Sequence, residues 1–141
     1  MKLAIGSDHA GFKLKEYIIR YLKRKQIPFK DFGTYSEDSC DYPDFAYPVA
    51  KAVSQKKCAR GILICGSGIG MAMTANKVKG IRAAQVYDLY TARMSREHND
   101  ANIITFAARE ISGPKAIKLL SVWLKTPFAG GRHLRRVRKI G

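Results

Sequence analysis

Residues 61–70 read Gly-Ile-Leu-Ile-Cys-Gly-Ser-Gly-Ile-Gly, and no other stretch of the chain indicates its fold as clearly. The run Ile62-Leu63-Ile64-Cys65 is apolar on both faces, which is typical of a strand that helices cover on each side of a parallel sheet. Glycines at 66, 68 and 70 follow at once, where the chain would turn from that strand into a helix. The stretch therefore predicts a strand–loop–helix unit of an α/β protein.

Short apolar runs and amphipathic segments alternate in both directions from this unit. Helical spacing recurs from Leu14 to Leu22 and again from Ile117 to Leu124, where the preceding Gly113-Pro114 suits a first helical turn. The sequence predicts an α/β fold, a single Rossmann-like three-layer domain over residues 1–141, with four or five crossover helices. Its five-stranded parallel sheet should have flavodoxin-like strand order. The expected strands are Lys2–Ser7, Pro28–Gly33, Gly61–Cys65, Arg82–Tyr87 and Ile103–Ala108.

Composition and charge narrow the class of protein but name no ligand. The 141 residues are 46% hydrophobic, which suits one domain with a sizeable core. A net charge of +15 favours anions, whether nucleic acid, acidic membrane surface or phosphorylated metabolite. The three cysteines, Cys40, Cys58 and Cys65, lack C-x-x-C spacing, so neither a disulfide framework nor a zinc site is predicted. No apolar run approaches the length of a signal-peptide core or a membrane span, so we expect a soluble, cytoplasmic protein.

The glycine-rich loop at 66–70 is a candidate anion-binding site. It should open a helix, and its glycines let backbone N–H groups approach an anion at the positive end of the helix dipole. The dinucleotide pattern G-x-G-x-x-G would place its third glycine at position 71, which is Met71. Asp88, about 20 residues further on, keeps a nucleotide-binding interpretation open. A structural role, in which the glycines only allow close helix-to-strand packing, is also open.

Cys65 and Ser67 are the side chains of this loop that can carry chemistry. The sulfur of Cys65 would lie at the end of a buried strand beside a helix N-terminus, where a thiolate is favoured as a base or nucleophile. Ser67 could donate or accept a proton within the same loop. The structural alternatives are a small core residue for Cys65 and a helix cap for Ser67.

Titratable side chains mark three other places. Asp8-His9 follows the first strand, on the side where open parallel sheets bind ligands, although Asp8 could equally cap the next helix. His98 lies near a helix C-terminus, where the dipole favours a protonated, donating ring, or where it could simply cap the helix. In the basic C-terminal segment at 130–141, Arg132 and Arg136 have the i,i+4 spacing that points both at one phosphate, although a solvated or nucleic-acid-binding arm is the plainer interpretation. No spacing of ligating residues indicates a metal site.

Read together, these motifs closely resemble the ribose-5-phosphate isomerase type B family, and the match runs nearly from end to end. The resemblance implies a cofactor-free and metal-free homodimeric enzyme that interconverts ribose 5-phosphate and ribulose 5-phosphate in the non-oxidative pentose phosphate pathway. It rests on Gly6-Ser7-Asp8-His9-Ala10-Gly11, Gly33-Thr34-Tyr35, Asp41-Tyr42-Pro43-Asp44, Ile64-Cys65-Gly66-Ser67-Gly68-Ile69-Gly70-Met71, Arg96-Glu97-His98-Asn99-Asp100-Ala101-Asn102 and Gly130-Gly131-Arg132-His133.

The resemblance implies how the glycine-rich loop acts. Cys65 would be the base that takes a proton from one substrate carbon and returns it to its neighbour. Ser67 stands where the family usually has threonine, and its hydroxyl would pass protons between the two substrate oxygens. The backbone N–H groups of Gly66, Gly68 and Gly70 would stabilise the enediolate.

It also implies which residues hold the sugar and the phosphate. His98 would open the furanose ring, while Asp8 and Asn99 would form hydrogen bonds with sugar hydroxyls. Tyr42 would form a wall of the sugar pocket. The implied phosphate ligands are His9, Arg109, Arg132 and Arg136.

The implied assembly is a homodimer, or a dimer of dimers, with active sites shared between chains. Asp8, Cys65 and the 66–70 loop would come from one chain, and His98, Asn99 and Arg109 from the other. The related galactose-6-phosphate isomerases divide these residues between two different subunits, whereas this chain carries both sets. We expect no nucleic-acid or membrane partner.

Three other functions compete with this one. An isomerase of a six-carbon sugar phosphate, allose 6-phosphate or galactose 6-phosphate, stays open because pocket depth is not readable from sequence. A nucleic-acid-binding module using the basic tail and a nucleotide-binding fold using the glycine-rich loop are the other two. Neither of these accounts for Asp8, Cys65 and His98 together.

Overall fold

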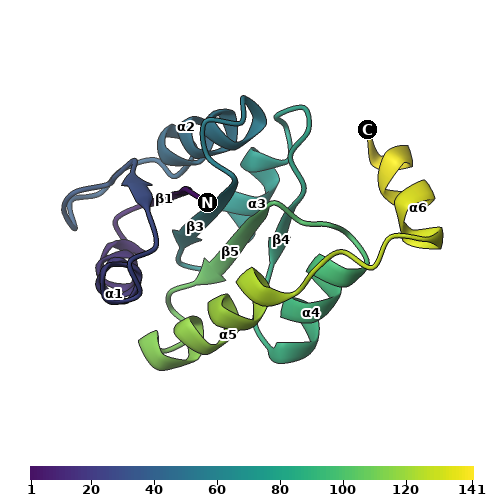
Figure 1. The fold of residues 1–141 in the computed structure, drawn as a ribbon. Helices are drawn as coiled ribbons and strands as arrows, with labels where there is room; N and C mark the ends of the chain where they lie inside the picture. Colours follow the sequence, from purple (N-terminus) through teal and green to yellow (C-terminus); the bar gives the residue numbers. More distant parts are fainter.

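The apolar run before the glycine-rich loop forms the central strand of a five-stranded parallel sheet in the computed structural model, which describes residues 1–141 (Figure 1). The spatial order is β2-β1-β3-β5-β4, and every pairing is parallel. This confirms the predicted α/β class and strand number. The strands are β1 (Leu3–Ser7), β2 (Phe29–Asp31), β3 (Arg60–Cys65), β4 (Ala83–Gln85) and β5 (Ile103–Ala107).

The structure corrects the expected strand order at one edge of the sheet. A flavodoxin-like order would place β4 beside β3, with β5 at the edge. Instead β5 lies between them, with Cys65 opposite Ala107 and Gln85 opposite Thr105. All five residues of β5 are buried, so this strand needs a neighbour on each side, whereas β4 is short and partly exposed, which suits an edge.

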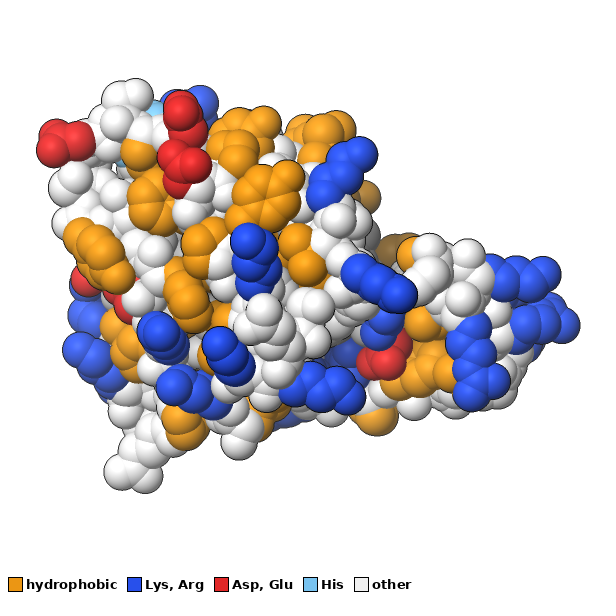
Figure 2. Space-filling model, turned by 90° about the horizontal axis from the view of Figure 1, so that it is seen from above, with side chains coloured by type: hydrophobic (Ala, Val, Ile, Leu, Met, Phe, Trp, Pro, Cys, Tyr) orange, Lys and Arg blue, Asp and Glu red, His pale blue; other side chains and the backbone are white.

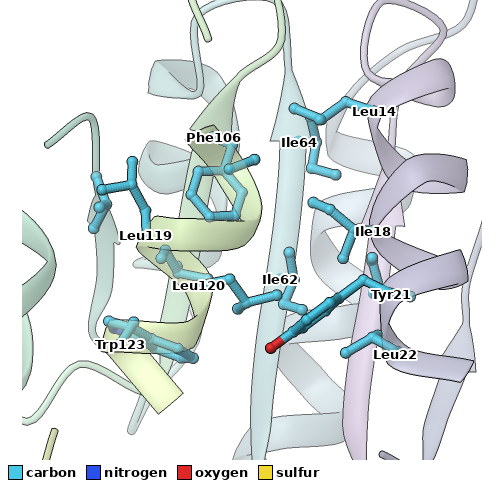
Figure 3. Packing of buried hydrophobic residues seen from close by; sticks show 14 of the residues in the cluster. Leu14, Ile18, Tyr21, Leu22, Ile62, Ile64, Phe106, Leu119, Leu120 and Trp123 are labelled. Atoms are coloured by element: carbon cyan, nitrogen blue, oxygen red, sulfur yellow. The ribbon is translucent and has the colours of Figure 1, made fainter. Parts of the chain in front are cut away.

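Helices cover both faces of the sheet. One face carries α1 (Phe12–Arg24), α4 (Leu89–Glu97) and α5 (Gly113–Lys125), and the other carries α2 (Pro43–Ser54) and α3 (Ile69–Ala75). Ile62 and Ile64 of β3 pack under α1 and α5, as Figure 3 shows, while Leu63 between them faces the opposite layer. Each such side chain contributes about 1.5–3 kcal/mol by leaving water. The alternation explains why β3 is apolar at every position from Ile62 to Cys65.

The C-terminal helix α6 (Arg132–Ile140) stands apart from these layers (Figure 1). It projects from the body in Figure 2, and Val137 is its one buried residue. The basic tail is thus an ordered helix and not a loose end of the chain. None of the helices combines the length and the hydrophobicity that a membrane crossing requires.

Candidate active site

A pocket of about 540 Å³ opens where β1 and β3 end, beside the glycine-rich loop. It brings together side chains that the sequence separates by about 100 positions, from Asp8 to Arg109. This is the edge of a parallel sheet where a ligand is expected. The residues lining it are Asp8, Tyr42, Cys65, Gly66, Ser67, Ile69, Gly70, Met73, Arg109 and Glu110.

The thiol of Cys65 is held by the loop that follows it. Cys65 is the last residue of β3, and its Sγ accepts a hydrogen bond of 3.1 Å from the backbone N–H of Gly68. The carbonyl of Gly68 in turn accepts from Thr105 Oγ1 of β5 at 2.8 Å. Gly68 has φ 75°, and a Cβ there would lie 3.0 Å from the Phe106 backbone. The loop therefore lies tightly against β5, as the structural interpretation of the glycines predicted.

The N–H of Gly68, expected to face a substrate oxygen, is directed at the cysteine sulfur instead. The backbone N–H groups of Gly66, Ser67 and Gly70 form no hydrogen bond within the protein. Ser67 is exposed, and its Oγ accepts from Ile69 N at 3.2 Å, so it also plays the local capping role considered for it. The backbone N–H groups of Gly66, Ser67 and Gly70 are thus the donors of the loop that are free to bind a ligand.

Two side chains from other segments pack on the glycines of the loop. A Cβ at Gly70 would lie 2.6 Å from the Tyr42 ring, and a Cβ at Gly66 would lie 3.1 Å from the Arg109 guanidinium. Arg109 N also donates to Gly66 O at 3.1 Å. The absence of side chains at 66 and 70 therefore lets Tyr42 and Arg109 form the walls of the pocket. Arg109 was expected to reach into a partner's site, and the structure places it in the pocket of its own chain.

Asp8 and His9 are fixed by backbone N–H groups. Asp8 is 7% exposed, and its Oδ1 accepts from Gly11 N at 3.0 Å, so it closes the turn before α1 while lining the pocket. His9 Nδ1 accepts from Cys40 N at 3.2 Å. Because Nδ1 is the acceptor, the proton of the neutral ring lies on Nε2, which leaves a donor for a ligand.

A buried ion pair supports this edge of the sheet and was missed by sequence reasoning. Lys15 is fully buried, with Nζ 2.7 and 2.8 Å from the two carboxylate oxygens of Asp31. Asp31 Oδ1 also accepts from Gly33 N at 2.9 Å, and Gly33 O accepts from Ser7 N at 2.6 Å. The pair therefore ties the segment after β2 to the end of β1. The signal was available, since Lys15 shares the apolar face of α1 with Ile18, three positions on.

The remaining predicted residues form a second cluster around α4 and α6. His98 ends α4, and its ring stacks on that of His133 with centroids 4.1 Å apart and planes 13° apart. His133 belongs to α6, which also carries the exposed Arg132 and Arg136. Asn99 is exposed beside His98. No role was predicted for His133 from the sequence.

The two clusters lie at opposite ends of the sheet within one chain. Cys65 lies at the carboxyl end of β3, opposite Ala107, whereas His98 precedes the amino end of β5 by five residues. Five residues of strand span about 17 Å, so no side-chain movement brings His98 to the Cys65 pocket. The structure therefore joins Asp8, Tyr42, Cys65, Ser67 and Arg109, and separates them from His98, Asn99, Arg132 and Arg136.

The stacked imidazoles make the docking of α6 sensitive to pH. Partial burial of the His133 ring lowers its pKa below the usual 6.5, and the positive charges of His98, Arg132 and Arg136 lower it further. The folded chain therefore holds this proton less tightly than the unfolded chain does. The stabilisation that the neutral His133 ring gives to the folded chain is fully present above about pH 6.5. It is lost as the pH falls through the lowered pKa of His133.

We predict that His133 titrates below a free histidine and that His98→Ala raises its pKa, because the substitution removes both the stacked ring and its charge. The ring-proton shifts of His133 measured by NMR between about pH 4 and pH 8 check this. His9→Ala is the matched control and should leave the titration unchanged. An unaltered His133 titration in His98→Ala would contradict the assigned cause.

Neither cluster resembles a metal or dinucleotide site. No three His, Cys, Asp or Glu side chains are grouped so that they could hold a metal ion. Asp88, which kept the nucleotide interpretation open, caps α4 by accepting from Thr91 N at 2.8 Å. That hydrogen bond lowers the pKa of Asp88. Its carboxylate is therefore committed to the helix start.

Comparison with known proteins gives consistent matches over almost the whole chain. Residues 3–140 match the family model described as Ribose/Galactose Isomerase. The chain is 49% identical over 137 residues to ribose-5-P isomerase B of Listeria innocua, covering 97% of this chain and 93% of the relative.

Two solved structures extend the comparison to the fold. Ribose-5-phosphate isomerase B of Clostridium thermocellum superposes with a TM-score of 0.99 at 52% identity, covering 100% of this chain and 95% of that one. The isomerase B of Mycoplasma genitalium, solved with bound ribulose-5-phosphate, gives a TM-score of 0.94 at 44% identity, with 99% and 93% covered.

Proposed function

The chain belongs to the ribose/galactose isomerase family, and we propose on this basis that it interconverts ribose 5-phosphate and ribulose 5-phosphate. The observation that carries the proposal is the Cys65 thiol, fixed by the Gly68 N–H at the edge of a pocket that also holds Asp8, Ser67 and Arg109. A thiol so placed can act as the base of an aldose–ketose isomerisation. The enzyme would act in the cytoplasm, as a step of pentose phosphate metabolism.

The proton transfer needs a single base and a hydroxyl. Cys65, as the thiolate, takes the proton from C2 of the open-chain aldose, and the electron pair moves to the carbonyl oxygen to form an enediolate. Ser67 Oγ passes a proton between O2 and O1, and Cys65 returns its proton to C1. The free N–H groups of Gly66, Ser67 and Gly70 would stabilise the negative charge of the enediolate, which builds up only as the C–H bond breaks.

The phosphate and the sugar ring occupy the two sides of this centre. We propose that Arg109 of the pocket and His9, next to Asp8 in the chain, bind the phosphate together with Arg132 and Arg136, and that Asp8 holds a sugar hydroxyl. Tyr42 forms the wall, supported by its packing on Gly70. His98, with Asn99 beside it, would protonate the ring oxygen and open the furanose.

A complete site then requires two chains. Within one chain, the cluster of His98, Asn99, Arg132 and Arg136 lies at the opposite end of the sheet from Cys65. We propose that a homodimer brings the α4–α6 cluster of each chain over the Cys65 pocket of its partner, so that two equivalent sites form about a two-fold axis. The exposed apolar side chains of Ile69 and Met73, which flank the pocket, would be covered in this assembly.

The proposed function is tested by assaying purified, metal-stripped protein for conversion of ribose 5-phosphate to the ketose. Turnover should need no added metal, and free ribose should be a poor substrate because it lacks the phosphate. Allose 6-phosphate and galactose 6-phosphate belong in the same assay, since faster turnover of either would move the assignment to a six-carbon substrate. Absence of turnover with every sugar phosphate would refute the proposal.

We predict that His98→Ala slows ring opening and not proton transfer. Consumption of the cyclic aldose should fall at least tenfold, because the furanose must expose its carbonyl before a C–H proton can leave. Ribulose 5-phosphate cannot close into the same five-membered ring, so exchange of its C1 proton with solvent should persist in the variant.

The equilibrium between the two sugars is unchanged by the enzyme, so net rates in both directions fall together. The informative measurement is therefore proton exchange from the ketose, followed by NMR in deuterated solvent. Loss of exchange in proportion to loss of turnover would place His98 in proton transfer and contradict the assignment.

A further inference from the structure

The positive charge of the chain is concentrated at the end of the sheet opposite the Cys65 pocket. At that end residues 97–102 contain Glu97 and Asp100, whereas the other five segments, residues 1–2, 17–30, 49–60, 76–82 and 119–126, contain fourteen Lys and Arg and no Asp or Glu. We call this surface the amino-end face, because the strands begin there. By contrast, residues 31–44, near the pocket, contain five Asp and Glu and no Lys or Arg.

This distribution is not what attraction of the substrate requires. A sugar phosphate enters at the carboxyl ends of the strands, so charge that served it would gather there. Figure 2 shows the same segregation on one side of the molecule, with most acidic side chains at the upper left and Lys and Arg predominating below and on the projecting α6. Attraction of the substrate therefore does not account for the fourteen positive groups at this end.

Two concave regions of the amino-end face are lined by lysines from separate segments. One, of about 320 Å³, is lined by Lys2, Lys30, Lys51 and Lys57. The other, of about 490 Å³ between α1 and α5, is lined by Lys25 and Lys125 of this face and by the adjoining Lys118. No acidic residue lines either, and none of these seven lysines has a carboxylate within 4.0 Å.

Backbone hydrogen bonds join the segments between the two concave regions into one rigid surface. Leu3 N donates to Pro28 O at 2.9 Å, and Ala59 N donates to Lys2 O at 2.7 Å. Arg60 Nη1 donates to Trp123 O at 3.2 Å and so ties the start of β3 to the end of α5. The backbone positions that carry the lysines are therefore fixed relative to each other over the whole face.

Helix ends do not explain this charge. Lysines in the last turns of α1, α2 and α5 compensate dipoles of about half a charge each, far less than the fourteen positive groups of the face. The end of α4 differs, because Asp100 there pairs with Arg82, one of the fourteen, and with Arg96. The uncompensated positive charge thus lies on the side of α1, α2 and α5.

We propose that the amino-end face binds the phosphate backbone of nucleic acid without reading its sequence. Lysines are flexible point charges that suit a row of phosphodiesters, and their spread over two grooves exceeds the reach of a single small anion. An anionic membrane is disfavoured, because insertion needs exposed apolar side chains among the basic ones and Met1 is the one large exposed apolar residue of these segments. This departs from the expectation of no nucleic-acid partner, and it places binding away from the tail.

The test is fluorescence anisotropy of a labelled single-stranded RNA of about 20 nucleotides, titrated between about 50 and 200 mM salt. The wild-type chain should bind with a Kd of about 1–100 μM, weakening with salt. Lys30→Glu/Lys51→Glu/Lys57→Glu should weaken binding at least tenfold. It should also lower the slope of log K against log salt by about 2, because each phosphate contact with a single strand contributes about 0.7 to that slope.

The matched control is Arg135→Glu/Arg138→Glu/Lys139→Glu, which reverses three charges on α6 and leaves the amino-end face intact. It should retain binding, and thermal unfolding of both triple variants near the wild-type temperature should show that the fold is intact. The proposal is overturned if wild type does not bind RNA at 50 mM salt, if the α6 variant alone loses binding, or if anionic vesicles bind through these lysines while RNA does not.

Discussion

Replacing Cys65 by alanine should lower isomerase activity by about 10²–10⁴-fold, the usual contribution of a positioned acid or base. If no other group can take the proton, activity should be lost completely. The fold should survive, because the thiol is a small group at a strand end and the Gly68 carbonyl remains bonded to Thr105. Binding of the sugar phosphate should survive as well, since Arg109, Asp8 and Tyr42 line the pocket independently of the thiol. The measurements are turnover, calorimetric binding of ribulose 5-phosphate and thermal unfolding.

The other two cysteines supply the controls. Cys58 is buried in the layer under α2, away from the pocket, and Cys58→Ala should change stability by only about 1 kcal/mol. Cys40 holds His9 through its backbone N–H, which Cys40→Ala retains, so this variant should be close to wild type. Near-normal turnover in Cys65→Ala would show that another group removes the proton.

The sequence predicted the parts of the fold whose burial is uniform. The residues of β1, β3 and β5 are all buried except Arg60 at the start of β3, and their apolar runs located these strands within one or two positions. The order of β4 and β5 was not predicted correctly, because both are preceded by helical segments of similar length. The distinguishing feature is exposure, since β4 has only three residues and ends in the exposed Gln85.

The candidate site was predictable where its residues are neighbours in the chain. Cys65, Ser67 and the glycines form one loop, so their proximity follows from the sequence, whereas the bond from Gly68 N to Cys65 Sγ needed the positive φ of Gly68. The location of Arg109 depended on Gly66 having no side chain. The stacking of His133 on His98 depended on where α6 docks, which no periodicity of the tail determines.

The partners of the buried polar residues behind the site could not be predicted from the sequence, for a related reason. Thr105 is a lone polar residue in an apolar strand, and Lys15 is a lone charge on an apolar helix face. Each marks a buried polar group that must have a partner, because an unpaired one costs several kcal/mol. Such residues indicate that a partner exists, but its identity, Gly68 O for Thr105 and Asp31 for Lys15, depends on the tertiary structure.

Mixing two inactive variants should restore about a quarter of wild-type activity if the sites are shared as proposed. When equal amounts of Cys65→Ala and His98→Ala chains are dissociated and recombined at random, about half of the dimers contain one chain of each kind. In such a dimer one site lacks both Cys65 and His98, and the other takes Cys65 from the His98→Ala chain and His98 from the Cys65→Ala chain. One intact site in half of the dimers is a quarter of the wild-type total.

The control for this experiment is a mixture of Cys65→Ala with Arg109→Ala, because the structure places Arg109 in the same pocket as Cys65 of its own chain. In their heterodimer one pocket lacks Cys65 and the other lacks Arg109, so recombination should restore nothing beyond the residual activity of the Arg109→Ala parent. Native mass spectrometry establishes that heterodimers have formed in both mixtures. Complementation occurs only between residues that different chains contribute to one site. Recovery with Arg109→Ala would therefore assign Arg109 to the partner chain, and no recovery with His98→Ala would mean that each chain holds its own complete site.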